Sequence, residues 1–221
     1  MGHPDMGKLA SARQEQPNRP LAAFDFDGTL TSHDSFRAFL AWRAGAAGYA
    51  VGLAQLIPAA VVWIRDRDRG RLKAAMVHRF LAGVPRPQLE ADAQTFAGER
   101  GRTLLRPDAV RTWRRWQSAG AQLVIVSATP DFIIAPIARS LGADLVIGTR
   151  LAFDAAGRAT GAFDGLNCRG PEKVRRLREV FGDDVRLAAA YGDSDGDAEM
   201  LAIAQERGMK VFTGAGGTYA P

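Results

Sequence analysis

The chain of 221 residues is 47% hydrophobic and 24% charged, a mixture typical of globular proteins, and its length favours one domain with an insertion over two equal domains. Its single cysteine, Cys168, excludes an internal disulfide and fits a reducing compartment, so we expect a cytoplasmic protein. The formal net charge of +5 favours an anionic partner. We expect no nucleic-acid partner, because no recognition module accompanies the charge.

The chain begins with a polar segment, residues 1–20, which lacks the apolar stretch of a secretory signal and which we interpret as a disordered arm. The apolar run Leu21–Phe24 follows it and ends in the polar loop Asp25-Phe26-Asp27-Gly28-Thr29. This pattern predicts a buried strand followed by a turn.

Residues 34–105 read as helical and carry no convincing strand, so we predict a helical cap inserted into a core made of residues 21–33 and 106–221. An uncharged run, 44–64, approaches the length of a membrane span. A single crossing would separate the first strand from the rest of its sheet, which argues against a span. We favour buried cap helices. The alternative is a cap surface that touches an anionic membrane through the basic residues after the run: Arg65, Arg67, Arg69, Arg71 and Lys73.

Strand and helix patterns alternate in the remainder of the chain. The apolar runs Leu123–Val126 and Val185–Tyr191 predict two further strands that end in polar loops, and the segments 150–153 and 159–163 predict a hairpin. Helices are expected between Pro107 and Gly120, from an N-cap at Asp131 to Gly142, and between Pro171 and Gly182. This alternation predicts an α/β fold with a doubly wound, mainly parallel, Rossmann-like sheet, whose ligands bind at the carboxyl ends of the strands.

The first strand ends in two carboxylates separated by one residue. Asp25 follows Phe24 at the end of a strand expected to be buried, where a carboxylate is costly unless a cation or donors compensate it. Asp27 lies two residues on, and Gly28 allows backbone N–H groups to approach a ligand closely. Taken alone, this motif is more simply an acidic turn that ends a strand.

A second pair of acids, Asp193 and Asp197, follows the third predicted strand. Carboxylates that converge from two strand ends need a hard divalent cation, and oxygen ligands suit Mg²⁺. The alternative is that Asp195 or Asp197 caps the following helix. One acid can serve as a cap, but two pairs of acids together favour a Mg²⁺ site.

A hydroxyl and a lysine accompany the acids. Ser127 ends the second strand before a helix start, where a hydroxyl and N–H groups can hold an anion, although a serine that merely ends a strand is an equal alternative. Lys173 lies in the first turn of its helix, where the macrodipole disfavours a cation. This placement favours a phosphate near Lys173 over a surface pair with Glu172, and it predicts that removing Lys173 leaves stability unchanged or slightly raised.

In this order the motifs Asp25-Phe26-Asp27-Gly28-Thr29-Leu30, Ser127, Lys173 and Gly192-Asp193-Ser194-x-x-Asp197 resemble those of the haloacid dehalogenase superfamily, across Leu21 to Phe212. The resemblance implies a phosphatase in which Asp25 is the nucleophile and Asp27 the general acid, then base. Dehalogenases of the superfamily lack the second aspartate, so Asp27 favours phosphoryl transfer.

The same resemblance implies a metal site and a phosphate site. Mg²⁺ would be held by Asp25, the backbone carbonyl of Asp27 and Asp193, with Asp197 in support. The residues implied to bind phosphate are Gly28, Ser127, Ala128 and Lys173.

The helical cap resembles that of the phosphoserine phosphatase subgroup. Asp34 falls where that subgroup uses a glutamate for the substrate amine, while Ala128-Thr129-Pro130 and Gly196 depart from its pattern. A weaker resemblance, in Asp34-Ser35-Phe36 and 168–173, is to bacterial phosphatidylglycerophosphate phosphatases. We therefore expect an amphiphilic or lipid phosphomonoester and peripheral contact with an anionic inner membrane face. The alternatives are a small soluble ester such as phosphoserine, or a phosphate-binding module without turnover.

Overall fold

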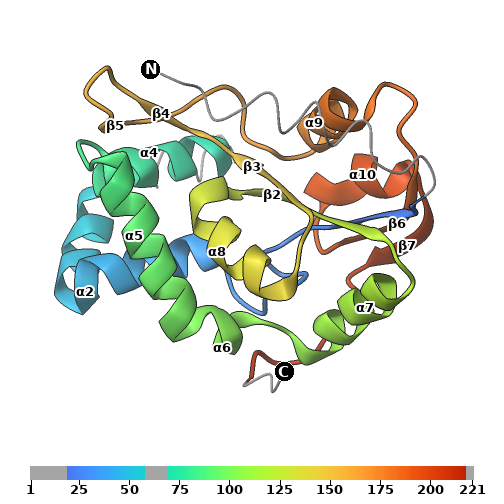
Figure 1. The fold of residues 1–221 in the computed structure, drawn as a ribbon. Coiled ribbons are helices and arrows are strands. Elements are labelled where there is room, and N and C mark those ends of the chain that lie inside the picture. The colour runs from blue at the N-terminus through green and yellow to red at the C-terminus, as the bar shows by residue number, and fades with distance from the viewer. Residues whose placement is uncertain (1–18, 58–68, 218–221) are drawn as a thin grey trace.

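The computed structural model describes residues 19–57 and 69–217, and its centre is a five-stranded parallel sheet (Figure 1). The strand order is β3-β2-β1-β6-β7. The strands are β1 (Leu21–Phe24), β2 (Gln122–Pro130), β3 (Leu145–Thr149), β6 (Leu187–Gly192) and β7 (Ala204–Met209). The predicted α/β fold with a mainly parallel sheet is confirmed.

Helices cover both faces of the sheet because alternate residues of each strand point to opposite sides. Ala22 and Phe24 of β1 belong to one buried cluster with Trp113, and Leu21 and Ala23 belong to another with Leu177. The helices are α7 (Pro107–Ser118) and α8 (Asp131–Leu141) on the first face, and α9 (Pro171–Phe181) and α10 (Ala198–Ala202) on the second.

Several elements differ from the sequence-based expectation. Strands β3 and β7 were not predicted, and β2 runs on to Pro130 through a register shift after Val126. Asp131 is the first residue of α8 and not its N-cap, which is Pro130. The guanidinium of Arg19 donates hydrogen bonds to the backbone carbonyls of Gly120 and Ala121. Arg19 is therefore bound to the core and is not part of the disordered arm expected for residues 1–20. Residues 1–18 lie outside the described residues.

A helical segment is inserted between β1 and α7, on the left of Figure 1. It contains α2 (Ser35–Gln55), kinked at Gly45 with φ 68°, then α4 (Arg69–Leu81), α5 (Arg86–Phe96), a π-helical turn (Ala97–Gly101) and α6 (Arg102–Leu104). Its two connections run side by side: the Ser32 N–H donates to Leu104 O and the Arg106 N–H donates to Leu30 O. This backbone pairing fixes where the segment leaves and rejoins the sheet.

A hairpin, β4 (Leu151–Phe153) and β5 (Ala159–Phe163), packs against α4 and not on the central sheet. Backbone hydrogen bonds join Ala159 to both Gly83 and Val84. Gly161, at φ 81°, lies so close to His78 that a Cβ there would be 2.6 Å from the ring. The predicted hairpin therefore exists, and it braces the inserted helices.

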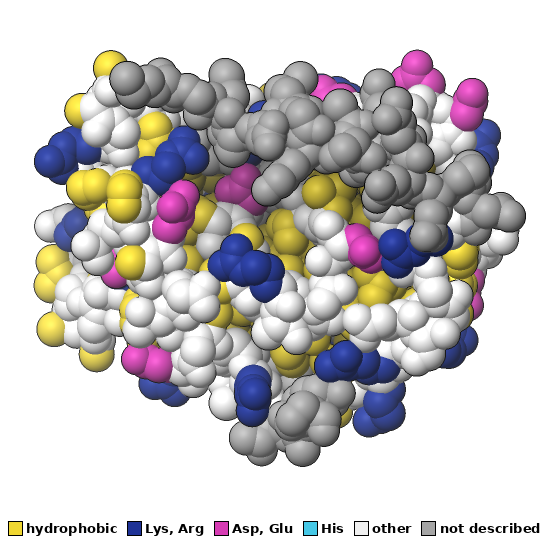
Figure 2. All heavy atoms as spheres, in the orientation of Figure 1, with side chains coloured by type: hydrophobic (Ala, Val, Ile, Leu, Met, Phe, Trp, Pro, Cys, Tyr) yellow, Lys and Arg dark blue, Asp and Glu magenta, His cyan; other side chains and the backbone are white. Residues whose placement is uncertain are grey.

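The uncharged run 44–64 is described only as far as residue 57. No helix within residues 19–57 and 69–217 has the length and apolar composition needed to cross a bilayer. Lysine and arginine side chains are scattered over the face shown in Figure 2 and form no single basic patch there.

Candidate active site

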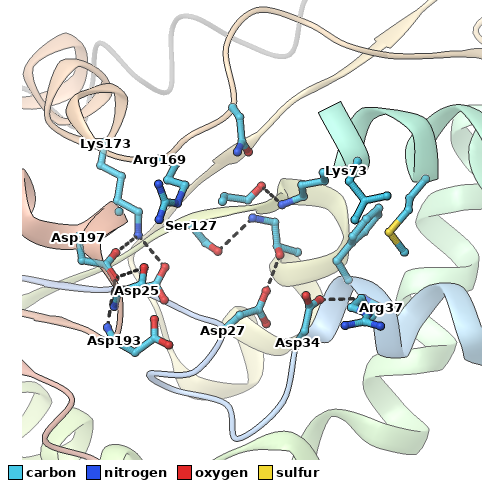
Figure 3. Close-up of a pocket in the computed structure, with 18 of the residues that line it drawn as sticks. Asp25, Asp27, Asp34, Arg37, Lys73, Ser127, Arg169, Lys173, Asp193 and Asp197 are labelled. Carbon is cyan, nitrogen blue, oxygen red and sulfur yellow. Dashed lines mark hydrogen bonds and ion pairs between the residues drawn. The ribbon is translucent and has the colours of Figure 1, made fainter. Parts of the chain in front are cut away.

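The carboxyl ends of the central strands open into a cavity of about 640 Å³ that is closed on the opposite side by the inserted helices. Figure 3 shows its residues in three groups, with Lys173, Asp25, Asp193 and Asp197 at one end, Ser127 and Asp27 between, and Asp34, Arg37 and Lys73 at the other end. We call Asp25, Ser127, Lys173, Asp193 and Asp197 the sheet wall. The helix wall consists of Phe36, Leu53, Leu56, Leu72, Lys73 and Met76.

Asp25 lies directly after β1 and is almost fully buried. Its backbone N–H donates to Tyr191 O, which continues the pairing of β1 with β6 and aims the side chain beyond the sheet edge. One carboxylate oxygen accepts from Lys173 Nζ at 2.6 Å and the other from the Thr29 hydroxyl at 3.3 Å. Burial raises the pKa of Asp25 to about 7, although Lys173 opposes the shift.

Lys173 is buried and holds the acids of the two strand ends together. Its ammonium donates to Asp25, to Asp197 and to the carbonyl of Val126, each at 2.6 Å. Burial alone would lower the pKa of Lys173, but the two carboxylates raise it, so the side chain stays charged. From the sequence, removal of Lys173 was predicted to leave stability unchanged or slightly raised. Because Lys173 is buried between two carboxylates, its removal is instead expected to lower the stability of the fold.

Asp197 is a partner of Lys173 and completes the capping box of the 3₁₀ turn Asp195–Asp197, whose N-cap is Ser194. One of its oxygens accepts from the backbone N–H groups of Asp193 and Ser194 and from the Ser194 hydroxyl, and the other accepts from Lys173. Burial acts to raise the pKa of Asp197, but Lys173 and these donors hold it below its ordinary value. The N–H groups of Asp193 and Ser194 precede the 3₁₀ turn Asp195–Asp197, and the Asp197 side chain makes no cap hydrogen bond to α10, so the interpretation of Asp197 as the cap of the following helix is wrong.

A group of carboxylates suitable for a cation lies at the sheet edge. Oxygen atoms of Asp25, Asp193 and Asp197 lie within 4.8 Å of one another. Within the described ranges no other residue donates a hydrogen bond to the Asp193 carboxylate, whose pKa is raised by burial and by Asp197. Gly28, at φ 82°, makes the approach possible, because a Cβ there would lie 2.1 Å from an Asp193 oxygen. This oxygen-only donor set fits a hard divalent metal ion.

Asp27 points away from this group, toward the inserted helices. Its carboxylate accepts from the Thr129 hydroxyl at 2.5 Å, from the Ser35 N–H at 2.8 Å and from the Thr31 hydroxyl at 3.3 Å. Burial raises the pKa of Asp27, and the neighbouring charge of Asp34 adds to the shift. Two acids of one turn thus have different surroundings, one beside a lysine and one among hydroxyl and amide donors.

The remaining predicted residues also lie at the cavity. The Ser127 hydroxyl is buried and accepts from the Thr129 N–H at 3.1 Å. The Ala128 carbonyl accepts from Lys73 Nζ at 2.7 Å. Asp34 is the N-cap of α2, where it accepts from the Arg37 N–H at 2.8 Å, and its carboxylate also lines the cavity.

Lys73 belongs to the basic flank that the sequence offered, as an alternative to buried cap helices, for contact with a membrane, and the structure places it in the cavity instead. Its ammonium lies in the cavity, 5.3 Å from the Phe36 ring centroid, and burial lowers its pKa despite the nearby Asp27 and Asp34. Arg65 and Arg67 lie outside the described residues, as does the Arg69 side chain.

Thr129, Lys73 and Arg169 are among the cavity residues that were not predicted as site residues from the sequence. Thr129 follows Ser127 by two residues, and this proximity could have identified it as a site residue. Nothing local in the sequence shows that α4 turns Lys73 inward or that the loop before α9 turns Arg169 toward the cavity, because both depend on packing between distant segments.

Comparison with known proteins decides the family. The family profile of haloacid dehalogenase-like hydrolases matches residues 22–202, most of the chain. The chain belongs to the haloacid dehalogenase-like hydrolases. Protein CicA of Caulobacter vibrioides is 59% identical over 194 residues, which cover 88% of this chain and 87% of that protein. A histidinol-phosphatase of Neisseria meningitidis is 27% identical over 198 residues, 84% of this chain and 87% of that protein.

The fold of this hydrolase is also found in solved structures. A substrate-bound phosphoserine phosphatase is 19% identical and superposes with a TM-score of 0.58 over 87% of this chain and 86% of that one. The sequence-based prediction of a haloacid dehalogenase-type phosphatase with this architecture is confirmed. The family match establishes a hydrolase, and the phosphatases among the relatives and the proteins of like fold support the predicted phosphatase.

Proposed function

We propose that the protein is a Mg²⁺-dependent phosphomonoester hydrolase that works through a phosphorylated Asp25. The observation that carries the proposal is the position of Asp25 in the wall of the cavity, bound to Lys173 and grouped with the carboxylates of Asp193 and Asp197. A carboxylate nucleophile divides a slow hydrolysis into two easier transfers.

In the first transfer the Asp25 carboxylate attacks phosphorus and the ester oxygen leaves, so that an acyl phosphate forms and an alcohol is released. Asp27 gives its proton to the leaving oxygen, a role supported by the raised pKa of its buried carboxyl. In the second transfer Asp27, now a carboxylate, takes a proton from water as the water oxygen attacks the acyl phosphate. Inorganic phosphate leaves, and both aspartates return to their starting states.

The chain's own groups hold the phosphate during both steps. Lys173 and Ser127 are the proposed ligands of the phosphoryl oxygens, with the Gly28 and Ala128 backbone beside them. Mg²⁺, bound by Asp25, Asp193 and the Asp27 carbonyl with Asp197 in support, would neutralise phosphoryl charge so that an anion can attack an anion. Thr129 and Ser35 orient Asp27 through their hydrogen bonds.

The experiment that tests this proposal measures hydrolysis of p-nitrophenyl phosphate with Mg²⁺ and with EDTA, for the native protein and Asp25→Asn. We expect EDTA and the substitution each to reduce turnover at least about 10³-fold, since each removes a group on which the chemistry depends. Arg178→Met, an exposed substitution at the other end of α9, is the matched control. An Asp25→Asn protein that stays active without metal would refute the mechanism.

For the substrate we propose an amphiphilic phosphomonoester, because five of the six helix-wall residues are apolar, whereas the charged Asp34 and Arg37 line the cavity at the start of α2. Phe36, Leu56 and Met76 are buried there, and Leu53 and Leu72 are half-buried. Each methylene of a substrate buried against such a wall contributes roughly 0.8 kcal/mol. Contact of the cap with an anionic membrane is part of this proposal, and it is supported by the exposed Val51 and Ile57.

The second candidate is a small soluble ester such as phosphoserine or histidinol phosphate, which the names of the related phosphatases support. The values of kcat/KM for octyl phosphate, phosphoserine and histidinol phosphate separate the two. Preference for octyl phosphate, with co-sedimentation on anionic vesicles, supports the amphiphilic substrate. Preference for a polar ester and no vesicle binding supports the second candidate.

A further inference from the structure

The loop that leads into α9 carries an arginine that the mechanism above does not use. Arg169 lines the cavity beside Lys173, and Figure 3 shows its guanidinium between Lys173 and Ser127. Within the part of the chain that the structure describes, no acceptor for this guanidinium is found. Its five N–H donors are therefore available to an anion in the cavity.

The loop is held firmly by its backbone and by buried neighbours. Cys168 is buried in the core, and its N–H donates to the Thr149 hydroxyl at 3.0 Å. The Gly170 N–H donates to Gly196 O at 2.8 Å, and the buried guanidinium of Arg176 donates to Leu166 O. Arg169 thus projects from a backbone that is fixed on both sides of it.

Gly196 provides the space that Arg169 occupies. A Cβ at Gly196 would lie 2.6 Å from Arg169 Cγ, 2.7 Å from its Nε and 3.0 Å from its Cζ. The arginine is therefore packed on the backbone of the residue before Asp197, the partner of Lys173. Any side chain at position 196 would push the guanidinium out of this place.

We propose that Arg169 is a further ligand of the transferring phosphate, which it binds together with Lys173 and Ser127, and that Gly196 is the residue that permits this position. The proposal rests on the proposed function of the same cavity. A guanidinium offers two parallel N–H donors to phosphate oxygens, which an ammonium cannot do. Arg169 would thus supply directional binding beside the point charge of Lys173.

The test is calorimetric binding of inorganic phosphate to the Mg²⁺-loaded protein, with kcat/KM for p-nitrophenyl phosphate measured in parallel. Arg169→Met removes the donors, Arg169→Lys keeps the charge without the fork, and Gly196→Ala keeps the arginine but fills its space. Arg178→Met, an exposed substitution in α9, the helix that follows this loop, is the control. Thermal melting identifies any variant that fails to fold.

We expect Arg169→Met to weaken phosphate binding and to lower kcat/KM about 10- to 100-fold. Arg169→Lys should give losses intermediate between the native protein and Arg169→Met, and the control should stay within about twofold of the native values. Gly196→Ala should approach Arg169→Met, and the double variant should be no worse than Arg169→Met alone. Unchanged phosphate binding in Arg169→Met would overturn the proposal. So would an unchanged kcat/KM for p-nitrophenyl phosphate in the same variant. Because phosphate binding is measured without turnover, the result is independent of whether Asp25 is the nucleophile.

Discussion

The sheet wall and the helix wall of the cavity differ in how their side chains are held. Lys173 is buried with three acceptors, and Asp197 has a donor on each oxygen. On the helix wall, Phe36, Leu56 and Met76 are buried, Leu53 and Leu72 are only half-buried, and Lys73 makes one hydrogen bond among the described residues, to a backbone carbonyl. We therefore propose that the sheet wall carries the reaction and that the helix wall selects the substrate.

The comparison also separates the two aspartates of the first motif. Asp25 belongs to the sheet wall through Lys173, whereas Asp27 reaches Ser35 at the start of the inserted helices. The position of the inserted helices can therefore affect the proposed reaction through Asp27. Substitutions on each wall should have distinct effects.

Lys173→Met should have the largest effect, because it leaves Asp25 and Asp197 buried without their shared cation. We expect a loss of about 3–5 kcal/mol in the free energy of unfolding, as for other broken buried pairs, together with near-complete loss of turnover. Urea denaturation measures the loss of stability and steady-state kinetics measure the loss of turnover, with Arg178→Met as the control. A protein as stable as the native one would show that Lys173 does not hold the sheet wall together.

Asp27→Asn should reduce turnover about 10²- to 10⁴-fold, the usual contribution of a general acid or base, with a smaller change in stability than Lys173→Met. The leaving group needs the protonated acid, and the pKa of Asp27 is raised by burial and by Asp34. The native rate should therefore be sustained above the ordinary carboxylate range and fall as pH rises through the raised pKa. If the Asp27→Asn protein shows the same fall in rate with rising pH, that fall belongs to the titration of another group.

Leu72→Gln should have the smallest effect and a selective one. Leu72 lines the cavity from the helix wall, so the substitution removes apolar contact with an alkyl chain and leaves the sheet wall intact. We expect kcat/KM to fall about 10-fold for octyl phosphate, a loss of one or two buried methylenes, and to stay within about twofold for phosphoserine. Leu166→Gln, the same substitution at an exposed position outside the cavity lining, is the matched control. Equal losses for both substrates would contradict a division of roles between the walls.

The parts of the fold predicted from sequence are those with strong local patterns. Strands β1, β2 and β6 are uninterrupted apolar runs, as expected for strands buried on both faces. Strand β7 was missed because Gln205, Glu206 and Arg207 are exposed on an edge strand and break the apolar pattern. Strand β3 is a five-residue run directly after a helix, too short to distinguish by periodicity alone.

The residues at the cavity divide in the same way. Asp25, Asp27 and Asp193 follow strand ends, so the geometry of a parallel sheet brings them to one edge. Ser127, predicted to end its strand, lies within β2 at the register shift after Val126. The inward orientation of Lys73 and the contact of Arg169 with Gly196 depend on how separate segments pack. No local pattern in the sequence carries that information, and the burial of Lys173 between two acids could not be deduced from its position in a helix turn.

The most direct test of the central claim is chemical identification of the phosphorylated residue. The Asp27→Asn protein, in which hydrolysis of the acyl phosphate should be slowed, is mixed with ³²P-labelled p-nitrophenyl phosphate and Mg²⁺ and quenched in acid within milliseconds. Our account predicts label that is released by hydroxylamine, maps to the peptide containing Asp25 and is absent from the Asp25→Asn protein. Label on another residue, or rapid turnover with no labelled protein at any quench time, would contradict it.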